Sequence, residues 1–119
     1  MRTFDELLAW QAQTARTDRS SAPAIAVCEE LAAEARWVEF ALLLRAWVAL
    51  KPQQRTTLVE ATPRFVLAAT GADPATIERF IQKHSEAADR VRADCLEPDR
   101  MPAAADALRE RFAARRADD

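Results

Sequence analysis

The chain has 119 residues, of which 50% are hydrophobic and 30% are charged, and its formal net charge is −2. This composition is typical of a globular domain, and it excludes both a disordered chain and a basic arm that binds nucleic acid by bulk charge. The single glycine is too few for a typical β-sandwich, a dinucleotide-binding fold or a phosphate-binding loop, which need positive φ angles at several turns. We therefore expect one all-α domain over residues 1–119.

Helix boundaries are marked by capping residues, prolines and apolar periodicity. Thr3 and Glu6 fit a capping box at the start of the first helix, and Pro23 fits the first turn of the second. Thr62 and Asp73 are good N-caps, each directly before a proline. The predicted helices cover, in chain order, residues of about 4–16, 23–50, 52–61, 63–70, 74–95 and 102–116.

The segment 37–50 is apolar almost all round, which indicates a helix covered on most sides by other helices. Glu39 and Arg45 interrupt it, and a membrane span needs roughly 20 apolar residues, so it reads as a core helix. Trp37 and Trp47 point about 80° apart on a helix, so both are buried only if the helix is wrapped on two sides. The sequence predicts a compact bundle of four to five helices around this buried central helix.

The residues that usually carry catalysis or bind metals are sparse. His84 is the only histidine, and it lies on the apolar stripe of its helix, where a core histidine is the commoner outcome. Cys95 shares that face but lies roughly 16 Å away along the axis, too far to chelate one ion together with His84. Cys28 falls into no recognisable ligand spacing. We expect no enzyme, no metal and no cofactor.

The first six residues include two acids and no apolar segment follows them, which argues against a secretory signal. We therefore expect a cytoplasmic protein whose two cysteines are ordinary thiols in a reducing compartment.

The segment 66–81 resembles the helix-turn-helix signature of bacterial DNA-binding proteins. Gly71 holds the turn position, and the packing positions carry Val66, Ala72, Ile77 and Phe80. The resemblance implies that Thr76, Arg79 and Lys83 lie near the exposed start of a recognition helix. The segment departs from the family at Leu67, where a small residue is usual. The same residues also fit a glycine C-cap followed by an Asp-Pro helix start with no role in nucleic-acid binding.

Three tryptophans are a large aromatic share for a small domain and suggest a face for a partner. Our leading hypothesis is a small non-enzymatic regulatory or adaptor protein that binds another protein, or a second copy of itself, through Trp10 and Trp37. Inhibitors, immunity proteins and phage- or plasmid-borne modulators of bacteria share this profile. The alternative is a helix-turn-helix nucleic-acid-binding regulator that acts as a dimer. A helical small-molecule carrier is a third class.

Overall fold

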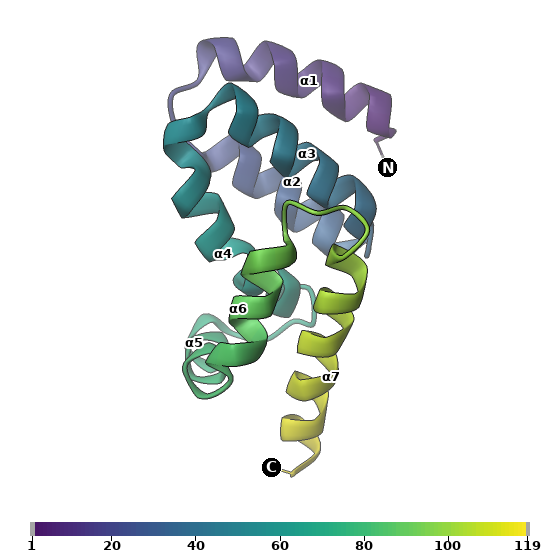
Figure 1. Cartoon of the computed structure of the whole chain (residues 1–119), viewed down its shortest axis with the longest axis vertical. Helices are drawn as coiled ribbons and strands as arrows, with labels where there is room; N and C mark the ends of the chain where they lie inside the picture. The colour runs from purple at the N-terminus through teal and green to yellow at the C-terminus, as the bar shows by residue number, and fades with distance from the viewer. Residues whose placement is uncertain (1, 119) are drawn as a thin grey trace.

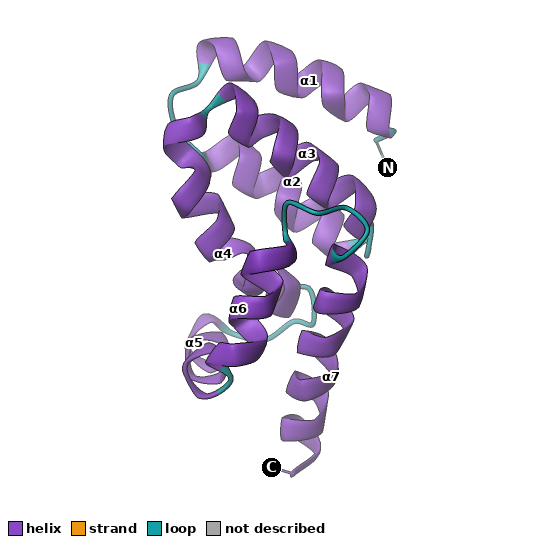
Figure 2. Cartoon of the chain, in the orientation of Figure 1, coloured by secondary structure: helices purple, strands orange, loops and turns teal. Residues whose placement is uncertain are grey.

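The computed structural model describes residues 2–118 of the chain, and the side chains of residues 2–115. These residues form seven α-helices and one short 3-10 turn, without a strand (Figures 1 and 2). The prediction of an all-α fold is therefore confirmed for the described residues. The elements are α1 (Phe4–Thr17), α2 (Ala22–Ala33), α3 (Trp37–Leu50), η1 (Pro52–Gln54), α4 (Arg55–Ala68), α5 (Pro74–Lys83), α6 (Ser85–Asp94) and α7 (Met101–Asp118).

The helices form an elongated body of 46 × 26 × 24 Å with two ends. At one end, α1 lies over α3, which runs antiparallel to α2; at the other end, α5, α6 and α7 gather around α4 (Figure 1). Helix α3 packs on α1, α2 and α7, whereas α4 packs on α2, α5, α6 and α7. The buried interior is thus shared between α3 and α4. The expectation of four to five helices around one central helix is not confirmed.

The predicted helix 23–50 is wrong as a single element, because it is divided by a tight turn at residues 34–36. The N–H of Arg36 donates to the carbonyl of Leu31 at 2.9 Å, and that of Ala35 donates to the carbonyl of Ala32 at 3.1 Å. This pattern is a Schellman motif, in which the residue after the cap adopts a left-handed conformation. Here Ala35 takes that place with φ 56°. Because the sequence has alanine at a position where such turns usually have glycine, it does not predict this turn.

We expect Ala35→Gly to raise the free energy of unfolding. A left-handed alanine costs roughly 1–2 kcal/mol, and part of the gain is offset by the greater freedom of glycine in the unfolded chain, so the net effect is about 1 kcal/mol. Urea unfolding followed by circular dichroism measures this change. Ala33→Gly, in the last turn of α2, is the control and should lower stability, since glycine disfavours a helix. Equal destabilisation by both variants would contradict the assignment.

Two further boundaries differ from the prediction. The predicted helices 52–61 and 63–70 are replaced by η1 and the continuous α4, with Pro63 inside the helix. Thr62 does not cap a helix; its hydroxyl donates back to the carbonyl of Leu58 at 3.0 Å. Both Thr62 and Pro63 are buried, so tertiary packing holds the helix together across its proline. The predicted helix 74–95 is likewise interrupted at His84, which lies between α5 and α6 with φ −115° and ψ 45°.

Both tryptophans of α3 are buried, as expected if this helix is covered on more than one side. Trp37 and Trp47 are 5% and 1% exposed, and α3 packs against α1, α2 and α7. Phe40 and Leu44 of the same helix are also fully enclosed. Within the described part of the chain, no helix combines the length and the apolar character that crossing a membrane requires.

Candidate functional site

The two tryptophans predicted to bind a partner lie in different surroundings and do not form one patch. Trp10 is half-buried, with its ring stacked on Trp47 at 6.2 Å between centroids and the guanidinium of Arg2 over it at 5.5 Å. Trp37 is buried, and the guanidinium of Arg109 lies over its ring at 5.3 Å. Trp10 therefore retains some accessible surface, whereas Trp37 offers a partner very little.

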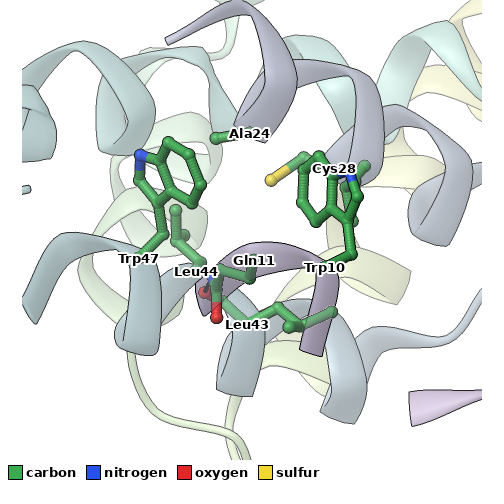
Figure 3. Close-up of a pocket in the computed structure, with 8 residues that line it drawn as sticks. Trp10, Gln11, Ala24, Cys28, Leu43, Leu44 and Trp47 are labelled. Atoms are coloured by element: carbon green, nitrogen blue, oxygen red, sulfur yellow. Dashed lines mark hydrogen bonds between the residues drawn. The ribbon is translucent and has the colours of Figure 1, made fainter. Parts of the chain in front are cut away.

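A small cavity lies where α1, α2 and α3 meet, and Figure 3 shows Trp10, Trp47 and Cys28 among the side chains that line it. Its volume is about 10 Å³ and its wall is almost entirely apolar. A cavity needs on the order of 10–15 Å³ to hold one water molecule, and several polar partners besides. This cavity is a gap in the packing and is too small for a carried ligand.

Two buried glutamines beside this cavity have clear structural roles. The amide nitrogen of Gln11 donates to the backbone carbonyl of Leu43 at 2.7 Å. Gln54 accepts from the indole N–H of Trp47 at 2.7 Å and donates to the carbonyl of Arg19 at 3.1 Å. Because buried polar groups are costly when unpaired, these bonds tie α1, η1 and the loop before α2 to α3. They hold these parts of the core together.

Both cysteines are free, buried thiols. Burial raises the pKa of Cys28 to about 12 and that of Cys95 to about 11. Since the thiolate is the nucleophile, the raised pKa values and the burial disfavour reaction of both thiols in the folded protein. We expect a thiol reagent such as DTNB to label neither cysteine at pH 8 in the native protein and to label both in 6 M guanidinium. Rapid labelling of the native protein would contradict the burial of these thiols.

The segment that resembles a helix-turn-helix places its residues on two sides. Its packing residues Val66, Ile77 and Phe80 are buried, and Gly71 adopts a positive φ of 85° in the turn. Asp73 caps α5 as predicted, since its carboxylate accepts from the N–H of Thr76 at 3.0 Å.

The residues predicted to contact nucleic acid lie on the opposite face of α5. Arg79 and Lys83 are exposed and Thr76 is half-buried, and the three follow one another at helical spacing. The guanidinium of Arg79 lies 3.4 Å from the hydroxyl of Thr76, within hydrogen-bond distance. The structure therefore brings these three side chains onto one side of α5.

The C-terminal half of α7 lies beside the junction of α5 and α6, because α6 and α7 run antiparallel along one another (Figure 1). Phe80 links the elements: its ring stacks on His84 at 4.3 Å and meets Phe112 of α7 edge-on at 5.2 Å. Arg111 directly precedes Phe112 in the sequence, and Arg115 follows it by three residues. Burial lowers the pKa of His84 first, and the charges of Arg111, Arg115 and Lys83 lower it further.

Stability should depend on pH through His84. The folded-state pKa of His84 lies below the unfolded value of about 6.5, so the unfolded chain takes up the proton at a higher pH than the folded chain. The free energy of unfolding therefore decreases as the pH falls through about 6.5. This contribution is complete above that pKa and stops changing below the folded-state pKa. Urea unfolding between pH 5.5 and 8, in MES and HEPES buffers, measures it. We expect His84→Gln to remove this part of the slope; equal slopes for both proteins would contradict the lowered pKa.

Sequence reasoning missed Arg111 and Arg115 as site residues. Their spacing of four residues indicates one helical face, but nothing in the sequence places that face beside His84. A metal site is not assembled either: in the described part of the chain no three His, Cys, Asp or Glu side chains come together to hold an ion.

The candidate sites are thus the half-buried Trp10 on α1, which packs against α3, and the basic side chains of α5 and α7. No protein-family model, no curated protein and no solved structure matches this chain.

Proposed function

We propose that the protein is a small non-enzymatic regulatory or adaptor protein that acts by binding another protein or a second copy of itself. The observation that carries this proposal is an apolar ridge on α3. In the described part of the chain, Val38 and Leu50 are the only exposed large hydrophobic side chains, at 47% and 53%. Both belong to the same helix.

The ridge is continuous. Val38, Leu42, Ala46 and Leu50 follow one another at intervals of four residues, and the two middle members are half-buried. Rows of side chains four apart are the ridges with which helices pack into the grooves of other helices. An apolar row of this kind, left partly open to water, is suited to an apolar groove or a matching helix of a partner. Trp10, which is half-buried on α1, belongs to the same end of the molecule (Figure 1).

A double variant, Val38→Glu with Leu50→Glu, tests this proposal. We expect the native protein to form a dimer in light scattering at high concentration, or to retain a partner in a pull-down from its host, and the variant to lose that association. Ala12→Glu with Ala26→Glu adds the same charge at exposed positions of α1 and α2 and is the matched control. A monomer that retains no partner, or equal loss in both variants, would refute the ridge as an interface.

A second candidate, a dimeric nucleic-acid-binding regulator, is favoured by a separate observation. Arg79 and Lys83 are exposed along one side of α5, the helix that follows Gly71. A gel-shift titration with duplex DNA at low salt tests it. We expect retardation that weakens in Arg79→Gln with Lys83→Gln, because contacts from cations to phosphates supply much of such affinity. Absence of retardation at micromolar protein would exclude this candidate.

A further inference from the structure

We propose that Lys83, His84, Arg111 and Arg115 form a binding site for a phosphate-class oxyanion at the junction of α5, α6 and α7. The proposal is independent of protein binding through α3, and it goes beyond the second candidate function by naming the residues that hold the phosphate. Its occupant is defined by the chemistry of the site: a tetrahedral oxyanion, either free phosphate or one phosphodiester of a nucleic acid.

The first observation is the fixed position of the imidazole. Its ring is stacked on Phe80 at 4.3 Å between centroids, and Phe80 is held edge-on against Phe112 of α7 at 5.2 Å. This chain of rings connects α5 to the second half of α7. His84 also lies at the break between α5 and α6, where it belongs to neither helix.

The second observation is an unsatisfied polar atom. The Nε2 atom of His84 is buried and has no hydrogen-bond partner among the described residues. Buried polar atoms are paired in the great majority of cases, so an unpaired one calls for a partner. As an N–H, this nitrogen can donate a hydrogen bond to an oxyanion.

The third observation is positive charge without compensation. Among the described residues, none of Lys83, Arg111 and Arg115 takes part in an ion pair. Arg111 and Arg115 lie one turn apart on α7, and Lys83 is adjacent to His84 in the chain. The charges that act on the pKa of His84 are all positive, and they come from α5 and α7. Several uncompensated cations around one point attract an anion and raise its local concentration.

The site is distinct from a surface hollow that Phe112 also lines. That hollow has a volume of about 310 Å³ and is lined by Gly71, Asp73 and Thr76 besides Phe112. The carboxylate of Asp73 already accepts hydrogen bonds from Thr76, and its negative charge disfavours an anion there. The oxyanion therefore belongs with the arginines and His84.

The single histidine makes the test specific, because its ring signals in the NMR spectrum report on this site alone. Inorganic phosphate is titrated into the full chain at pH 7.5 and constant ionic strength, and a short DNA duplex is titrated in a parallel series. We expect a saturating shift of the His84 signals. We also expect sodium sulfate, whose charge is constant between pH 5 and 8, to raise the pKa of His84, since a bound anion favours the imidazolium.

Arg111→Gln with Arg115→Gln should weaken phosphate binding about tenfold, the loss expected for two partly exposed charged contacts. Arg16→Gln with Arg45→Gln removes the same charge from exposed positions on α1 and α3 and should leave binding unchanged. In the DNA series, the slope of log affinity against log salt should fall by about 2 in the first variant only.

A shift with inorganic phosphate supports a site for the free ion, and a shift with DNA alone supports a phosphodiester site. No saturating shift with either ligand, or equal binding by the two double variants, overturns the proposal. If DNA is retarded in gels while neither phosphate nor DNA changes the His84 signals, the proposal is also overturned, because the nucleic acid then binds elsewhere. In that case the second candidate function stands while this site does not.

Discussion

Replacing Trp47 by alanine should lower the free energy of unfolding by about 3–5 kcal/mol, as is usual for a large aromatic side chain removed from a core. Trp47 is 1% exposed, and it is stacked on Trp10. Its indole N–H is also the donor to Gln54, which is buried, so the alanine variant leaves an amide oxygen without its partner. The small cavity beside the ring would enlarge, since α1, α2 and α3 all meet there.

Two further variants separate these contributions in urea unfolding followed by circular dichroism. Trp47→Phe keeps an aromatic ring but removes the N–H, and it should cost about 1–3 kcal/mol, chiefly from the unpaired Gln54. Val38→Ala, on the exposed ridge of the same helix, should change stability by less than about 0.5 kcal/mol. If Trp47→Ala were as mild as Val38→Ala, the enclosed position of α3 would be wrong.

The elements that the sequence predicted well are those with local signals. The box at Thr3 and the Asp-Pro pair at residue 73 mark true helix starts, because each cap bonds to an N–H three residues later in the chain. The apolar character of residues 37–50 likewise reflects a helix that is enclosed on several sides. In these cases local chemistry and tertiary packing favour the same structure.

The boundaries that the sequence did not predict are set by tertiary packing. Ala35 adopts a conformation that is usual for glycine, and the turn it makes allows α3 to fold back on α2. Pro63 lies inside α4 because its surroundings are buried, although a proline commonly begins a helix. His84 ends α5 with no glycine or proline nearby. Each of these local conformations is unfavourable by itself. Contacts between residues distant in sequence offset that cost.

In the candidate sites, too, some features could be predicted from local sequence patterns and others depend on tertiary packing. Thr76, Arg79 and Lys83 could be placed on one face of α5 from their spacing alone. Their proximity to Arg111 and Arg115 depends on the antiparallel packing of α6 and α7, which no local pattern encodes. The burial of Trp37 depends in part on Arg109, which lies over its ring from 72 residues further along the chain. A single sequence does not predict which side chains the tertiary fold brings together in a site.

Phe80→Ala should also lower the free energy of unfolding by about 3–5 kcal/mol, because the ring is 1% exposed and joins His84 to Phe112. Phe80→Leu is the milder control, with a cost of about 1–1.5 kcal/mol, since it retains most of the buried volume. The alanine variant should also lose hydrogen-exchange protection in α5, which is held chiefly by α4 and α6 once the ring is removed.

The same variant tests whether residues 1–119 are one domain. All three tryptophans lie in α1 and α3, so tryptophan fluorescence reports on the end of the molecule opposite Phe80, whereas circular dichroism reports on every helix. In a single cooperative unit, Phe80→Ala should shift both unfolding transitions by the same amount, because α2, α4 and α7 connect the two ends. A fluorescence transition that stays in place while the circular dichroism transition divides would mean that the two ends unfold independently.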